Sequence, residues 1–261
     1  MNARGKAEVE TVLRPVGFRS DVPRLGVILL ATDLTTERDI ARTIPPGRAG
    51  VHATRVAYAN PTTPENLRRM LPLLAGATEL IVPGLPLAAV AFACTAASSV
   101  LGDDAVREAV QSVRPGVPVI TPAGAARRAF AALGLRRIAL LTPYLPETTR
   151  PVIDFFETEG IEIMRATCLG IDDDRRMALA DDATILAAAE EADHPSAEAL
   201  FISCTALPAM ALAAEIEMRL GKPVVTSNQA SIREMRAAAG ITEGIAGFGI
   251  TLAGADMRGT P

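Results

Sequence analysis

Two of the three cysteines in this 261-residue sequence, Cys94 and Cys204, occupy matching contexts 110 positions apart. Each ends a short apolar run and is followed by threonine and alanine. A cysteine at the start of a helix meets unsatisfied N–H groups and the positive end of the helix dipole, which favour the thiolate and lower its pKa. Two such thiols on opposite sides of a carbon atom can remove a proton from one face and return one to the other. The pair therefore indicates acid–base chemistry at a carbon centre.

The remaining cysteine and the two histidines are residue types that can bind metals or form disulfides, but they are too far apart in the sequence to predict either role. Cys168 has no partner in the first half of the chain and is expected to be a packed thiol, as a lone cysteine commonly is. The two histidines, His52 and His194, are far apart, so we expect no metal site. With three cysteines and no CxxC pair, a disulfide framework is not expected, and a reducing compartment would keep the thiols free.

Short aliphatic runs alternate with Ala-rich segments of helical periodicity, which predicts an α/β fold with mainly parallel sheets covered on both faces. We expect strands at residues 25–31, 51–57, 88–93, 117–120, 137–141, 161–165, 199–203 and 223–226. We expect helices at residues 64–74, 103–113, 123–133, 147–159, 181–191 and 208–220. Further helices are expected at 35–44 and from about residue 230.

An internal repeat divides these elements into two halves. Residues 27–34 align with 138–145, and almost the same offset carries Cys94 onto Cys204. The repeat predicts two similar flavodoxin-like halves, residues 24–121 and 122–228, related by pseudo-twofold symmetry, with residues 229–261 packing on the first half and 1–23 as an N-terminal extension. Ligands of open parallel sheets bind beyond the carboxyl ends of the strands. We therefore expect Asp33, Cys94, Tyr144 and Cys204 to meet in one cleft.

Composition narrows the function classes. A formal net charge of −4 gives no reason to expect a nucleic-acid partner. Prolines and a glycine interrupt the apolar stretch at residues 80–101, and the N-terminus has no apolar core of a secretory signal. We therefore expect a cytoplasmic protein without a membrane partner, and a homodimer only by default. Gly240, Gly244, Gly247 and Gly249 lack the strand-before and helix-after context of a dinucleotide fingerprint, so no cofactor is expected.

Four segments together resemble the aspartate/glutamate racemase superfamily. They are Ala-Cys-Thr-Ala-Ala-Ser at 93–98, Leu-Thr-Pro-Tyr at 141–144 followed by Glu147, Ser-Cys-Thr-Ala-Leu-Pro at 203–208, and Pro-Val-Val-Thr-Ser-Asn-Gln-Ala at 223–230. Within the superfamily, the sequence is similar over residues 25–252 to the branch of maleate cis-trans isomerases, arylmalonate decarboxylases and ectoine-utilization proteins of the EutA type. The resemblance implies a cofactor-independent isomerase or racemase of a small carboxylic or amino acid, with Cys94 and Cys204 as its catalytic pair.

The same resemblance implies roles in substrate binding. Tyr144 would hydrogen-bond a substrate carboxylate, although its hydroxyl could also simply face water. Asn228 would help to hold carboxylate oxygens, although Asn at this place could equally cap the helix near residue 230. The residues after each cysteine, Thr95, Ala96 and Thr205, would contribute N–H groups, which a developing enolate needs.

The sequence departs from the family pattern at Asp33. Maleate isomerases have Ser-Asn-Thr-Thr after the first strand, whereas residues 32–35 are Thr-Asp-Leu-Thr, with Thr35 a further candidate for binding. A carboxylate in a dry cleft repels a second carboxylate and attracts an ammonium group, so Asp33 suits an amino acid or an N-acylated diamino acid. Its alternative role is to cap the helix at 35–44.

Several activities remain open. In a racemase one cysteine removes a proton and the other supplies one. In a maleate cis-trans isomerase a thiolate adds to the double bond. A decarboxylase is less favoured, because arylmalonate decarboxylases keep only the cysteine that corresponds to Cys204. An alternative from a different functional class is a protein that binds small acids without catalysis and whose thiols are inert. The EutA-type resemblance implies a substrate from ectoine breakdown, such as an N-acetylated diaminobutyrate.

Overall fold

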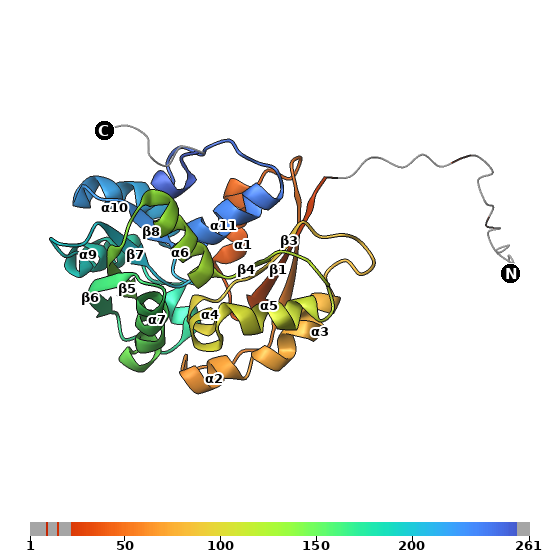
Figure 1. Ribbon diagram of the computed structural model, residues 1–261, viewed down its shortest axis with the longest axis horizontal. Helices are drawn as coiled ribbons and strands as arrows, with labels where there is room; N and C mark the ends of the chain where they lie inside the picture. The colour runs from red at the N-terminus through yellow and green to blue at the C-terminus, as the bar shows by residue number, and fades with distance from the viewer. Residues whose placement is uncertain (1–8, 10–14, 16–21, 255–261) are drawn as a thin grey trace, which may run out of the picture.

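Two four-stranded parallel sheets form the framework of the chain (Figure 1). The computed structural model describes residue 9, residue 15 and residues 22–254. The first sheet has the order β2-β1-β3-β4 and the second the order β6-β5-β7-β8. Their strands are β1 (Arg24–Leu30), β2 (Gly50–Val56), β3 (Ala89–Phe92), β4 (Val119–Ile120), β5 (Arg137–Thr142), β6 (Glu162–Cys168), β7 (Ala199–Ile202) and β8 (Val224–Thr226). The shared strand order confirms two similar α/β halves.

Helices connect the strands and cover the sheets. They are α1 (Thr36–Thr43), α2 (Pro64–Arg68), α3 (Leu74–Glu79), α4 (Thr95–Leu101), α5 (Asp103–Gln111), α6 (Pro122–Leu133), α7 (Pro146–Thr158), α8 (Asp174–Met177), α9 (Asp182–Ala192), α10 (Ala213–Leu220) and α11 (Ser227–Ala238). Single 3₁₀ turns lie at Leu71–Leu73, Met210–Leu212 and Ile250–Leu252. In the part of the chain that the structure describes, no helix is long and apolar enough to cross a membrane.

The expected strands all occur, and the differences lie mainly in the helices. The helix expected at 64–74 is divided into α2, a 3₁₀ turn containing Pro72 and α3, because proline cannot donate the helical hydrogen bond. The helix expected at 208–220 becomes α-helical only from Ala213. Strand β6 runs on to Cys168, so this cysteine ends the strand. The expected extension at 1–23, apart from residues 9, 15, 22 and 23, and the end of the C-terminal segment lie outside the described residues.

The core fixes the strand ends that carry the candidate site. All four residues of β3 and all four of β7 are buried. Phe130 of α6, Phe156 of α7 and Phe201 of β7 pack with ring centroids 5.2–5.6 Å apart, which holds both helices against the second sheet. Helix α11 packs against β3 and β8, and so joins the two sheets. The ends of β3 and β7 are therefore held on a rigid base.

Candidate active site

Cys94 and Cys204 follow equivalent strands of the two halves. Cys94 lies two residues beyond β3 and Cys204 two residues beyond β7, and each strand pairs with the first strand of its own half. Both cysteines are buried, with 6% of each residue exposed. A negative charge on Cys204 raises the pKa of Cys94, so the two thiols act on each other within one site. The structure thus brings together the pair expected from the repeat.

Cys94 is the N-cap residue of α4, as its sequence context predicts. Its sulfur accepts the N–H of Ala97 at 3.4 Å, and its backbone is extended. The sulfur takes the place that a serine or threonine oxygen fills in most helix caps. The buried start of α4 therefore orients this thiol.

Cys204 does not begin a helix, which corrects the expectation from the sequence. Its φ angle is 104°, in a region that residues other than glycine rarely adopt. The chain beyond it forms a turn, with Pro208 before the 3₁₀ turn at Met210–Leu212. The N–H groups of Ala206 and Leu207 point back to the Cys204 sulfur and lower its pKa. The turn thus supplies the donors that a helix N-terminus was expected to supply.

Burial governs the acidity of both thiols. It strongly raises the pKa of Cys94, and it raises the pKa of Cys204 to about 12. Backbone N–H groups do lower the pKa of each thiol, as expected, but in the ligand-free protein the loss of hydration outweighs them. Both cysteines are neutral thiols at neutral pH in this state.

Tyr144 lies beside Cys204, at the end of β5. Only 2% of the residue is exposed, which excludes a hydroxyl that simply faces water. The Tyr144 hydroxyl lies 3.5 Å from Oγ of Ser203 and donates to the Cys204 sulfur, which lowers the pKa of that thiol. Burial and the nearby thiols hold the pKa of Tyr144 well above its usual value. Tyr144 is therefore a neutral hydrogen-bond donor within the site.

The threonine hydroxyls join the two halves around the cysteines. Thr205 donates to the carbonyl of Ala93 at 2.9 Å, and Thr35 donates to the carbonyl of Ala206 at 2.5 Å. Thr95 donates to Oγ of Ser227 at 2.8 Å. These side chains position the backbone on either side of the thiols. Within residues 22–254, the backbone N–H groups of the candidates Thr95, Ala96 and Thr205 have no hydrogen-bond acceptor, so they remain available to a ligand.

Asn228 lies next to this network, and its amide group is already engaged. Its Nδ2 donates to Oδ2 of Asp39 at 2.8 Å and to the carbonyl of Thr205 at 3.0 Å. Because a rotated amide would turn its oxygen toward those two acceptors, the contacts fix its orientation. The Oδ1 atom is buried and has no partner among the described residues. Asn228 therefore positions the turn after Cys204 and offers a ligand only an acceptor.

Asp33 accepts hydrogen bonds from the residues at the start of α1. Its Oδ1 accepts the N–H groups of Thr35 at 3.0 Å and Thr36 at 2.9 Å, and its Oδ2 accepts the hydroxyl of Thr36 at 2.6 Å. The carboxylate is buried, and its charge is among those that raise the pKa of Cys94. Both of its oxygens are thus used by the start of α1, although its charge still acts on the site.

Reasoning from the sequence missed Asp174 and Tyr58, which lie near the same thiols. The Asp174 carboxylate is buried, accepts the hydroxyl of Thr32 at 2.6 Å, and raises the pKa of both cysteines by its charge. The pKa of Tyr58 is raised by burial and by both cysteines. These residues follow β6 and β2, the outer strands. The repeat directed attention to the inner strands, but the acidic run at 172–174 was a visible signal.

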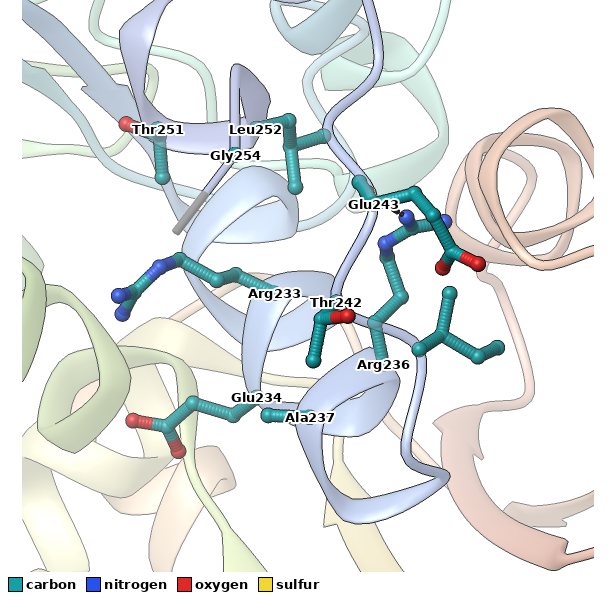
Figure 2. Close-up of a pocket in the computed structure, with 10 residues that line it drawn as sticks. Arg233, Glu234, Arg236, Ala237, Thr242, Glu243, Thr251, Leu252 and Gly254 are labelled. Atoms are coloured by element: carbon teal, nitrogen blue, oxygen red, sulfur yellow. Dashed lines mark hydrogen bonds between the residues drawn. The ribbon is translucent and has the colours of Figure 1, made fainter. Parts of the chain in front are cut away.

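A surface pocket at α11 lies away from this chemistry. It is lined by the last turns of α11 and by residues 241–254, and it contains none of the candidate site residues (Figure 2). Its buried arginine, Arg236, donates to the carbonyls of Thr43 and Glu243. This arginine therefore secures the C-terminal segment.

Comparisons with known proteins match the fold and the sequence. A family model described as arylmalonate decarboxylase matches residues 75–251. Maleate isomerase from Alcaligenes faecalis is 23% identical over 246 residues, 88% of this chain and 96% of that protein. Arylmalonate decarboxylase from Bordetella bronchiseptica is 32% identical over 148 residues, 56% of this chain and 60% of that protein.

Solved structures agree with these matches. A serine-for-cysteine variant of Nocardia farcinica maleate cis-trans isomerase, with a covalently bound succinylcysteine intermediate, superimposes with a TM-score of 0.80 at 23% identity. The match covers 88% of this chain and 98% of that one. The two-sheet framework is therefore the fold of these enzymes.

Proposed function

This chain belongs to the arylmalonate decarboxylase family, within the aspartate/glutamate racemase superfamily, and on that premise we propose that it isomerises a small acid without a cofactor. The reaction takes place at the carbon atom next to a carboxylate. Cys94 and Cys204 act as the acid–base pair. The cysteines belong to the two different halves, and this is the observation that carries the proposal.

The proton route of a racemization follows from this arrangement. One cysteine, as thiolate, takes the proton from the α-carbon, and its S–H bond forms as the C–H bond breaks. The electron pair moves into the carboxylate to give an enolate. The other cysteine, as thiol, then delivers its proton to the opposite face. The free N–H groups of Thr95, Ala96 and Thr205 stabilise the enolate oxygens.

Cys204 is the better candidate for the first thiolate. Tyr144, Ala206 and Leu207 all donate to its sulfur, whereas the Cys94 sulfur accepts the N–H of Ala97. Hydrogen bonds to a charged form stabilise that form. A substrate that displaces water and brings its own polar groups further changes the relative stability of the two thiolates. We therefore assign proton removal to Cys204 in one direction and to Cys94 in the reverse direction.

Maleate cis-trans isomerization is the second candidate, because maleate isomerase from Alcaligenes faecalis matches 88% of this chain. In this reaction the Cys94 thiolate forms a C–S bond to one alkene carbon, and the Cys204 thiol gives its proton to the other carbon. Rotation about the new single bond and reversal of both steps give fumarate. The succinylcysteine of the Nocardia farcinica enzyme is an adduct of this kind. The buried carboxylates of Asp33 and Asp174 disfavour a dianionic substrate.

One experiment separates these activities. The protein is incubated in deuterated water with amino acids, N-acetylated diaminobutyrates, maleate and aryl malonates, and NMR follows α-hydrogen exchange, fumarate and loss of carboxylate. The Cys94→Ser and Cys204→Ser variants are measured in parallel. Exchange that both variants lose supports the proposal, and fumarate formation supports the second candidate. Absence of all turnover, together with thiols that resist alkylation, would replace the proposal by a small-acid-binding protein.

A further inference from the structure

Asp174 is a buried carboxylate that forms no ion pair with any residue that the structure describes. Only 5% of the residue is exposed. Its Oδ2 accepts the hydroxyl of Thr32, whereas its Oδ1 accepts no hydrogen bond from any residue in the described ranges. Arg175 and Arg176 follow it in the chain, but Arg175 pairs with Asp173. No ion pair within residues 22–254 involves Asp174. Such a group is costly to bury, and proteins normally pair it with a cation.

The charges around Asp174 add to this cost. Asp33 and Asp173 both act on it with negative charge. Burial, together with these charges, raises the pKa of Asp174 to about 6, so the carboxylate is ionised at neutral pH. A cationic group bound beside it would relieve both the repulsion and the loss of hydration.

Asp174 lies close to the candidate catalytic thiols, so a bound substrate could supply the missing cation. Thr32, which donates to Oδ2 of Asp174, lies just beyond β1, and β1 pairs with β3, the strand that leads to Cys94. Asp174 therefore lies at the same end of the sheet as this thiol, and its charge raises the pKa of both Cys94 and Cys204. The backbone N of Asp174 donates to Oδ1 of Asn60, and the N–H of Thr62 donates to the carbonyl of Asp172. These contacts hold the loop after β6 against the loop after β2. The carboxylate is thereby fixed beside the thiols.

Two other buried carboxylates in this region are already committed. Both oxygens of Asp33 accept hydrogen bonds from Thr35 or Thr36 at the start of α1. Asp39 accepts the amide of Asn228, and the positive charges of Arg38 and Arg42 partly offset the rise in its pKa that burial causes. Asp174 alone combines a free oxygen with a direct effect on both thiols, and no cation acts on it among the described residues.

We propose that Asp174 is a specificity-determining residue that binds a protonated amino group of the substrate. The inference rests on the proposed function, and it narrows the substrate class to small carboxylic acids that also carry an ammonium group. The backbone N–H groups beside the cysteines bind the carboxylate. Asp174 binds the ammonium group and repels a second carboxylate.

Matched pairs of ligands test the inference by calorimetry at pH 7.5. Each amino acid is compared with the acid that lacks one amino group: aspartate with succinate, alanine with propionate, and 2,4-diaminobutyrate with 4-aminobutyrate. We expect at least one amino member to bind more tightly than its partner. We expect Asp174→Asn to weaken that ligand about 30-fold or more, as loss of one member of a buried charge pair does. The same variant should bind the ligand without that amino group equally well or better.

Asp172→Asn is the matched control, because it removes the same charge from an exposed position two residues away. It should leave the affinities unchanged. The inference is overturned if no amino member binds better than its partner, or if the two variants change the preference equally. A melting curve of each variant verifies that it is folded.

The outcome is separable from that of the proposed function, because binding and hydrogen exchange are measured independently. Cysteine-dependent exchange without a preference for ammonium would retain the isomerase and remove the role of Asp174. A preference that depends on Asp174, without exchange in any ligand, would retain the recognition site and remove the isomerase.

Discussion

The hydroxyl of Thr95 donates a 2.8 Å hydrogen bond to Oγ of Ser227, and the same Oγ accepts the N–H of Cys204 at 3.1 Å. One buried serine thus links the motif that follows Cys94 to the backbone of Cys204. The contact sets the position of one cysteine motif relative to the other. Two-sided proton transfer depends on this position, because a small misplacement of reacting groups is costly.

Ser227→Ala should therefore reduce both stability and activity. The change leaves two buried donors unpaired, which costs about 1–3 kcal/mol of unfolding free energy. Denaturant titration measures this loss, and the exchange assay measures the activity. Ser231→Ala is the control, because its hydroxyl donates to the carbonyl of Ser227 one turn along α11. Equal loss of activity in both variants would contradict the positioning role of Ser227.

Tyr144→Phe should raise the pKa of Cys204 and slow turnover. The variant removes a donor to the Cys204 sulfur and keeps the ring in its buried place. Loss of one such donor typically slows a reaction about 100-fold. Tyr58→Phe is the comparison, since the Tyr58 hydroxyl donates to Thr62 at 2.7 Å. We expect a smaller effect from that change, and a larger one would transfer the donor role to Tyr58.

The thiols should differ in their reaction with iodoacetamide. Cys168 is partly exposed and should be alkylated first. Of the two buried cysteines, Cys204 should react before Cys94, because three groups donate to its sulfur. Both rates should rise with pH above neutrality, since burial raises both pKa values. Peptide mass spectrometry over time gives the order, and faster labelling of Cys94 at every pH would contradict the assignment.

The ligand-free protein should become more stable at neutral pH in the Asp174→Asn variant. The pKa of Asp174 is raised from 3.8 to about 6, so the stability linked to this group is present below pH 3.8 and is lost as the pH rises through about 6. A rise of about two pH units corresponds to about 3 kcal/mol. The variant's advantage in unfolding free energy should appear near pH 7 and shrink toward pH 4. An advantage independent of pH would contradict the ionised state of Asp174.

The framework could be predicted from the sequence because most strands are short apolar runs, and because the first strand and the cysteine motif of one half recur in the other. The alignment of Cys94 with Cys204 therefore placed both at equivalent strand ends. The turn after Cys204 could not be predicted, because its positive φ angle depends on contacts such as that of Asn228 with the carbonyl of Thr205. From the sequence, Asp33 could either bind the substrate or cap the following helix. Only the structure shows that its oxygens accept hydrogen bonds at the start of α1.

The position of Asp174 could not be predicted from the sequence for a different reason. It follows an outer strand and comes beside the cysteines because two loops pack together, with Thr62 donating to the carbonyl of Asp172 at 2.7 Å. These residues lie more than a hundred positions apart. No local pattern encodes that contact, so the sequence alone did not distinguish Asp174 from a solvent-exposed acidic run.

The most direct test of the account is enantiomer-resolved hydrogen exchange of a turned-over acid in deuterated water, with the wild-type protein and the Cys94→Ser and Cys204→Ser variants. If the cysteines act from opposite faces, the wild-type protein exchanges both enantiomers and interconverts them. Each variant should lose interconversion, and any exchange left in the two variants should favour opposite enantiomers. Interconversion that survives in either variant would contradict the two-cysteine mechanism.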